Sequence, residues 1–167
     1  FYEMLESLQN KLFRMVLEKL FIVDAQKVTG VIDRNTVCIG MTDILTDLDQ
    51  FFSTTDDLIT LWAPLLQCLI AVFELPQDKT EQADDHFVEI EEMNMGYQAS
   101  YSRLVFATNQ ELDLIADIGQ PKLYLAQKLH QLSTRYPGKI STLISSMSPD
   151  AAKFLQNYFI LANVSIS

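Results

Sequence analysis

The sequence predicts an all-α protein in which antiparallel helix pairs stack in series. Apolar residues recur mostly every three or four positions, which is the period of amphipathic helices. Only five glycines and five prolines occur among 167 residues, too few for the many turns of an all-β protein. The composition is 49% hydrophobic, which is enough for a sizeable core in one domain.

The first predicted helix covers residues 3–20 and carries one broad apolar stripe. Residues 21–29 either continue it or start a short second piece, and Gly30 ends this region because glycine suits the position after a helix. The stripe contains Leu5, Leu8, Leu12, Val16 and Leu20, with Phe13 and Leu17 beside it.

The second predicted helix runs over residues 34–52, with Asp33 as its N-cap. Gly40 lowers helix propensity in mid-helix, so we expect another helix to cross closely there. The predicted inner face consists of Val37, Met41, Ile44, Leu45, Leu48 and Phe52.

The third predicted helix spans residues 55–75 and is apolar on more than one side, so neighbours should cover it from two sides. Asp56 and Asp57 lie in its first turn, where carboxylates favour the helix dipole. Pro64 should either kink this helix or mark a late start, because proline lacks the backbone N–H that the helix interior needs.

Residues 76–96 follow as an acidic insertion that is too polar for a core helix and long for a loop in a compact helical domain. Between Glu74 and Glu92 the chain carries eight carboxylates against the single Lys79, a local balance of −7. Apolar Phe87, Val88, Ile90 and Met93 are interleaved with them. Two readings stay open: a fixed acidic patch for a basic protein surface, or an acidic linker held by a hydrophobic tether.

The chain resumes as helix from Tyr97 and breaks again at Gly119–Pro121. A helix over residues 121–135 has proline at its first position, and residues 136–138 end it. Ser148 is a strong N-cap for the last helix. The predicted inward residues of this region are Leu125, Ala126, Leu129, Leu132, Ile140, Leu143, Ile144, Met147, Phe154, Leu155, Tyr158, Phe159 and Ala162.

About eight helical pieces joined mostly by short turns favour antiparallel neighbours. Paired, they form units of about 40 residues, the size of HEAT or armadillo repeats, although no repeat of fixed period is visible. The predicted divisions are a helix pair over 1–52, a pair with the insertion over 53–118, and terminal helices over 119–167. The chain starts in helical rhythm without an initiator methionine, so we expect it to be a piece of a longer protein.

Signals for catalysis or for a cofactor are missing from the sequence. His86 and His130 lie in different helical units, no glycine-rich loop suits a phosphate, and the acidic insertion lacks the fixed pattern of a calcium loop. Cys38 and Cys68 lie in apolar helical patterns, which predicts reduced thiols in the core rather than metal ligands. We therefore expect neither an enzyme nor a bound metal or cofactor.

Net charge and hydropathy restrict the partners. The formal charge of −10 disfavours nucleic acid and anionic membrane surfaces, and a partner recruited by charge should be basic. No window reaches the roughly 18 apolar residues of a membrane span, and there is no signal peptide.

Four stretches in succession carry a resemblance: LWAPLLQCLIAVFELP, ADDHFVEIEE, GYQASYSRLVFA and PKLYLAQKLHQLSTRYPGKI. In this order they resemble the C-terminal end of a nuclear export receptor of the karyopherin-β family. The resemblance implies an α-solenoid, with this chain forming the last three or four HEAT-type helix pairs. It also implies a receptor that carries importin-α together with Ran-GTP, assembling in the nucleus and disassembling in the cytoplasm.

The resemblance gives the acidic insertion a candidate role in binding the basic surfaces of these partners. The hypothesised contact residues are Asp84, Asp85, Glu89, Glu91 and Glu92. The alternative is that the chain only caps the end of the solenoid, because terminal repeats need a polar outer face. In isolation, the first helix should expose part of Tyr2, Leu5, Leu12 and Phe13, so we expect the fragment to self-associate.

Overall fold

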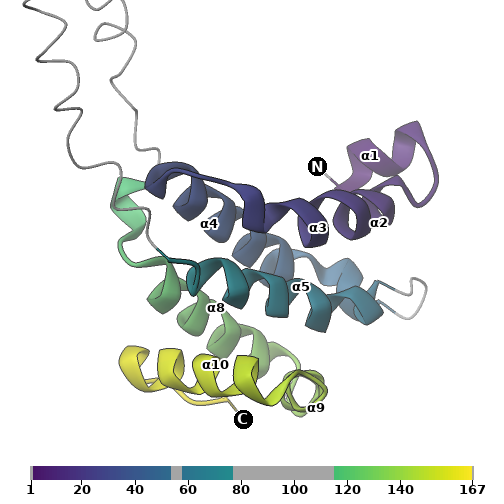
Figure 1. Ribbon diagram of the computed structural model, residues 1–167. Helices are drawn as coiled ribbons and strands as arrows, with labels where there is room; N and C mark the ends of the chain where they lie inside the picture. The colour runs from purple at the N-terminus through teal and green to yellow at the C-terminus, as the bar shows by residue number, and fades with distance from the viewer. Residues whose placement is uncertain (1, 54–57, 77–114, 167) are drawn as a thin grey trace, which may run out of the picture.

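The computed structural model describes residues 2–53, 58–76 and 115–166, and within these ranges the regular structure is helical, with no strand (Figure 1). The all-α prediction is confirmed. The α-helices are α1 (Tyr2–Leu8), α2 (Leu12–Val16), α3 (Ile22–Asp24), α4 (Val31–Asp47), α5 (Ile59–Phe73), α8 (Pro121–Arg135), α9 (Lys139–Ser145) and α10 (Pro149–Ala162). A π-helical turn spans Leu17–Phe21, and 3-10 turns span Ala25–Lys27, Asp49–Phe52 and Ala116–Ile118.

The four long helices are stacked in layers. Helix α4 packs along α5 and α8, and α10 packs against α8 and α5. Helix α5 also packs on the helical turns between Leu17 and Lys27. Figure 1 shows these layers following one another from the α3–α4 end to the α9–α10 end. This is the serial stacking that the sequence predicts for a fragment of an α-solenoid.

The prediction of one continuous helix over residues 3–20 is wrong, because the helix breaks between Gln9 and Lys11. Lys11 has a φ of 62°, a left-handed conformation that ends a helical run. The backbone N–H groups of Lys11 and Phe13 donate to the Glu6 carboxylate, at 2.8 and 3.1 Å. Glu6 therefore satisfies the amides at the start of α2, which offsets the cost of the break.

The break changes which apolar residues are inside. Phe13 and Leu17 are buried as predicted, but Leu8 is 73% exposed and Leu20 is 54% exposed. Phe13 was also expected on the exposed face of the fragment, and its burial corrects that prediction. Tyr2 packs edge-on against Phe13, with ring centroids 5.2 Å apart.

Helix α4 begins at Val31, immediately after Gly30, whose φ of 86° is open to glycine at little cost. Asp33 lies inside the first turn, so its prediction as the N-cap is wrong. The helix ends at Asp47 because Leu48 is extended, and Asp49–Phe52 form a separate 3-10 turn. Met41, Leu45 and Phe52 are buried, as the predicted inner face requires.

Gly40 is exposed, and a Cβ placed on it would meet no atom within 4 Å. The predicted close helix crossing at this position is therefore wrong. We expect Gly40→Ala to raise the free energy of unfolding by about 0.5–1 kcal/mol, because alanine restricts the unfolded chain and favours helix. Urea unfolding followed by circular dichroism measures this change.

Gly138 provides the contrasting control for this substitution. Its φ of 76° lies in the left-handed region, so Gly138→Ala should destabilise although open space surrounds the position. A loss of stability in both variants would show that Gly40 has a packing role that its surroundings do not reveal.

Helix α5 begins at Ile59 and continues through Pro64, so a late start at this proline is wrong. The predicted first-turn residues Asp56 and Asp57 lie outside the described residues. The helix is covered from more than one side, as predicted. Its buried residues are Leu61, Trp62, Leu65, Leu66, Cys68, Leu69, Ile70 and Val72.

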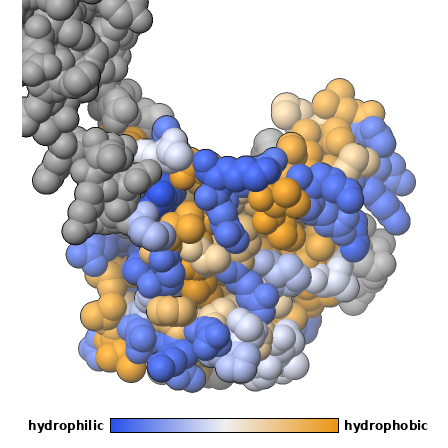
Figure 2. All heavy atoms as spheres, in the orientation of Figure 1, coloured by the Kyte–Doolittle hydropathy of each residue, from blue (hydrophilic) through white to orange (hydrophobic). Residues whose placement is uncertain are grey.

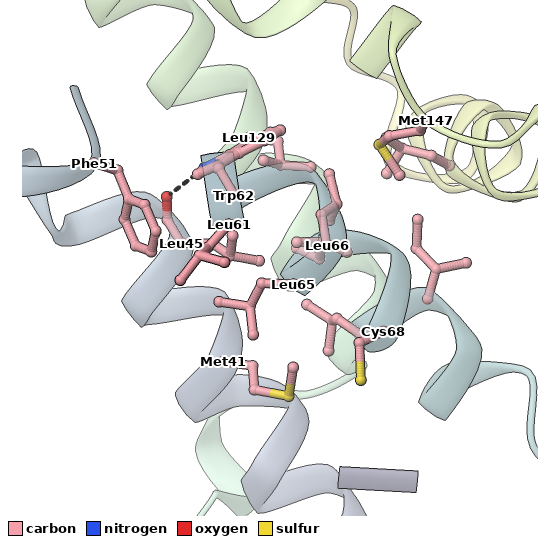
Figure 3. Close-up of a cluster of buried hydrophobic side chains, with 14 of the residues drawn as sticks. Met41, Leu45, Phe51, Leu61, Trp62, Leu65, Leu66, Cys68, Leu129 and Met147 are labelled. Carbon is pink, nitrogen blue, oxygen red and sulfur yellow. Dashed lines mark hydrogen bonds between the residues drawn. The ribbon is translucent and has the colours of Figure 1, made fainter. Parts of the chain in front are cut away.

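Trp62 joins the core to the end of α4. Its side chain is fully buried, and its indole Nε1–H donates to the Leu45 carbonyl oxygen at 3.0 Å (Figure 3). From α8, Arg135 donates through Nη2 to the Thr46 carbonyl oxygen at 2.8 Å. Carbonyls in the last turn of a helix lack donors within the helix, so these two side chains act as a tertiary cap for α4.

The C-terminal helices begin and end close to where the sequence predicts. Most of their predicted inward residues are at least partly buried, but the prediction for Phe154 is wrong, because its side chain is 39% exposed. Helix α8 starts with Pro121 and ends at Arg135, as predicted. Ser148 caps α10, with its Oγ accepting from the Ala151 N–H at 3.4 Å. The fully buried apolar residues of α8 are Leu125, Ala126, Leu129 and Leu132.

Candidate protein-binding surfaces

The five carboxylates predicted to bind a partner, Asp84 to Glu92, lie outside the described residues, as does His86. The structure does describe the residues on either side of the acidic insertion. The chain before it ends with α5, Glu74 and Pro76, and the chain after it enters α8 through a 3-10 turn and Gly119.

Glu74 links the two ends of the insertion. Its Oε1 accepts hydrogen bonds from Lys122 Nζ at 2.7 Å and from the Tyr158 hydroxyl at 2.5 Å. Burial raises the pKa of the Glu74 carboxyl, but the hydrogen bonds from Lys122 and Tyr158 outweigh it and leave the pKa below its usual value. The pKa of Tyr158 is raised, first by burial and then by this hydrogen bond. We call Glu74, Lys122 and Tyr158 the insertion clamp.

A hollow of about 300 Å³ lies beside the insertion clamp, between α4, the end of α5 and the start of α8. Arg34 lines it and donates through Nη1 to the Pro76 carbonyl oxygen at 3.1 Å. Cys38 also lines it, but burial raises the pKa of this thiol to about 12. A thiol with such a pKa stays protonated at neutral pH and is a poor nucleophile.

The described residues offer little catalytic chemistry. Within them, no group of three or more His, Cys, Asp or Glu residues is arranged to hold a metal ion. Cys38 and Cys68 are free and buried, as the sequence predicts. His130 is partly buried, and its Nδ1 contacts the Ser165 carbonyl oxygen in the C-terminal segment.

A polar network covers the seam between α4 and α8. Lys128 pairs with Asp47 at 2.7 Å and with Asp43 at 3.6 Å. The Tyr124 hydroxyl donates to Asp43 at 2.7 Å. Further along, Arg135 lies 3.6 Å from Asp49, and the Asp49 carboxylate accepts from the Tyr136 hydroxyl at 3.1 Å.

The network sets the protonation of its members. Burial lowers the pKa of Lys128, but the hydrogen bond and charge of Asp47 outweigh it, so the pKa is raised and the cation is held. Burial, followed by the hydrogen bond to Asp43, raises the pKa of Tyr124. This face was not predicted from the sequence. The sequence feature that points to this face is a matching one-turn spacing: Asp43 and Asp47 are four residues apart on one helix, and Tyr124 and Lys128 are four residues apart on another.

Exposed apolar side chains gather at the N-terminal end, and Figure 2 shows hydrophobic residues over α1–α3 on the face in view. The exposed large residues of this end are Met4, Leu8, Met15, Leu20 and Val23. This set differs from the one that periodicity predicts. Tyr2 and Leu5, which were predicted to be exposed, are only partly exposed.

Self-association of the isolated chain through this end stays a prediction. We expect the weight-average mass in light scattering to rise with protein concentration, and to rise less in a Leu8→Lys, Leu20→Lys variant, because exposed apolar area drives association. A strict monomer at high concentration would contradict the prediction.

Known families and proteins include clear relatives of this chain. A model of the family described as CAS/CSE protein, C-terminus, matches residues 1–158. The chain belongs to the CAS/CSE family. Among its relatives in this family, exportin-2 of Xenopus laevis is 44% identical, that of Pagrus major 43% and that of Homo sapiens 40%, each over 166 residues. These alignments cover 98% of this chain and 17% of each relative. No solved structure matches the chain.

Proposed function

We propose that this chain is the C-terminal part of a nuclear export receptor that carries importin-α back to the cytoplasm in a complex with Ran-GTP. The observation that carries the proposal is the 40–44% identity to proteins named exportin-2, which extends over 98% of the chain. The receptor is a binding scaffold and not an enzyme. It shuttles between nucleus and cytoplasm and needs no cofactor of its own.

The structure supports a scaffold role through its surfaces. Ion pairs across the α4–α8 seam and in the insertion clamp join neighbouring helices of the stack, as a rigid scaffold requires. No helix in the described ranges is long and apolar enough to cross a bilayer. The acidic insertion supplies more than half of the chain's net charge of −10, and basic protein surfaces are its natural partners.

One pull-down tests the proposal: full-length receptor against a version lacking these 167 residues, with importin-α and Ran-GTP supplied together. We expect the truncated receptor to recover much less of the ternary complex. Equal recovery would overturn a direct role and favour the second candidate, a module that only closes the solenoid. The packing of Val164 and Ile166 against the core, beyond α10, favours that second candidate.

The acidic insertion needs a separate test in the full-length receptor. Reversal of Glu89, Glu91 and Glu92 to lysine should slow complex assembly and weaken its salt dependence, because exposed charges act mainly on association rate. Unchanged rate and salt dependence would mean that these carboxylates only keep the protein soluble.

A further inference from the structure

A groove of about 380 Å³ runs between α1 and the C-terminal half of α4. Its floor is apolar. Phe13 of α2 lies at the base with Tyr2 of α1 packed edge-on against it, and Ile44 of α4 and Leu48, just after α4, form the other side. Phe13 is buried, whereas Tyr2, Ile44 and Leu48 are only partly covered. The groove therefore leaves apolar surface open to a partner.

The rim of the groove is acidic. Glu3 borders it from α1, and Asp43 and Asp47 border it from α4, while no basic residue among those the structure describes lines it. Asp43 and Asp47 share Lys128, which approaches from the α8 side. Tyr124 and Lys128 both contact Asp43 through its Oδ1 atom. About half of each aspartate side chain stays exposed, at 44% and 51%.

We propose that this groove binds a basic amphipathic helix of a partner protein, in which an apolar side chain is flanked by lysines or arginines. Asp43 and Asp47 are one helical turn apart, so two cations one turn apart on the partner helix match them. The aliphatic stems of those cations cover the apolar floor while their charged ends reach the rim. The apolar residue between them fills the space over Phe13 and Ile44.

Charge decides between the candidate occupants. A second copy of this chain carries the same net charge of −10, which opposes docking on an acidic rim. Nucleic acid is repelled for the same reason. The groove is a surface separate from the acidic insertion, and the proposal stands independently of the export function.

The experiment uses the 167-residue chain and a fluorescein-labelled helical peptide that carries leucine between lysines spaced by three and four positions. Fluorescence anisotropy measures binding. Two further peptides serve as comparisons, one with the leucines changed to serine and one with the lysines changed to glutamate. We expect binding of the first peptide only, weakening as salt increases because the rim charges are exposed.

Variants of the chain locate the site. Asp43→Asn with Asp47→Asn should weaken binding about five- to tenfold, since two exposed pairs are lost. Ile44→Ser should weaken it while leaving the charge unchanged. The matched control is Asp33→Asn with Asp117→Asn, which removes the same charge from two exposed positions outside the groove and should change affinity less than about twofold.

Three results would overturn the proposal. The control variant weakening binding as much as the groove variant would show a general attraction of opposite charges. Equal binding of the serine peptide would show that the apolar floor has no role. Groove variants that abolish self-association in light scattering but leave peptide binding intact would assign the groove to a second copy. Circular dichroism of each variant verifies that it is folded.

Discussion

Replacing Trp62 by alanine is expected to lower the free energy of unfolding by about 3–5 kcal/mol, the range for large aromatic residues removed from a core. The side chain is fully buried where α5 meets α4 and α8 (Figure 3). The substitution leaves a cavity and also removes the donor to the Leu45 carbonyl oxygen. The total free energy of unfolding of a small domain is about 5–15 kcal/mol, so this one change removes a large part of its stability.

Urea unfolding followed by far-UV circular dichroism measures this loss, because Trp62 is the only tryptophan and its fluorescence disappears with it. Trp62→Phe separates the two contributions. It keeps an aromatic ring in the core but leaves the Leu45 carbonyl oxygen without its indole donor, which should cost about 1–3 kcal/mol. A loss below about 1 kcal/mol in the alanine variant would contradict the central position that the structure gives this residue.

Tyr158→Phe is expected to lower the free energy of unfolding by about 1.5–3 kcal/mol at neutral pH, the contribution typical of a hydrogen bond to a charged group. Tyr158 is 3% exposed, so little water replaces the lost bond to Glu74. The Lys122–Glu74 pair adds less, because its side chains are about one third exposed and the solvent screens them.

The contribution of the insertion clamp should depend on pH. The folded-state pKa of Glu74 lies below its unfolded value, so its stabilisation is complete above about pH 4.3, the ordinary glutamate pKa. It is lost as the pH falls through the folded-state pKa, because protonated Glu74 is a weaker acceptor. The difference between wild type and Tyr158→Phe should therefore shrink below about pH 4.

Tyr136→Phe is the matched control for this measurement. Its hydroxyl also donates to a carboxylate, that of Asp49 at 3.1 Å, but Asp49 is largely exposed and water can replace the lost bond. This variant should lose less than about 0.5 kcal/mol. Equal losses from Tyr136→Phe and Tyr158→Phe would show that the hydrogen bond in the insertion clamp stabilises the fold no more than an exposed one does.

Local signals explain where prediction from the sequence succeeded. Helix α8 begins with Pro121 and α10 with the Ser148–Pro149 cap, and both signals act within a few residues of the boundary that they mark. Periodicity alone placed Leu125, Leu129 and Leu132 inside. The break after α1 was missed because it depends on Glu6 reaching two amides in the next turn, a contact that apolar spacing does not encode.

The polar surfaces required the tertiary structure. The pairing of Asp47 with Lys128 joins residues 81 positions apart. The one-turn spacing within each helix marks a polar face, but it does not say which other helix that face will meet. The groove beside α4 likewise exists only because α1 folds back over Phe13. The hypothesised contact residues of the acidic insertion lie outside the described residues and stay a prediction.

By itself, the sequence determined that this chain is helical, which leucines of α8 are buried, and that its net charge is strongly negative. These properties follow from periodicity, helix caps and composition, which act locally or sum over the chain. Only the tertiary structure decided where the first helix breaks, what caps α4, and which charges meet across the α4–α8 seam. The physical reason is that these contacts join residues distant in sequence, and packing in three dimensions selects the partners.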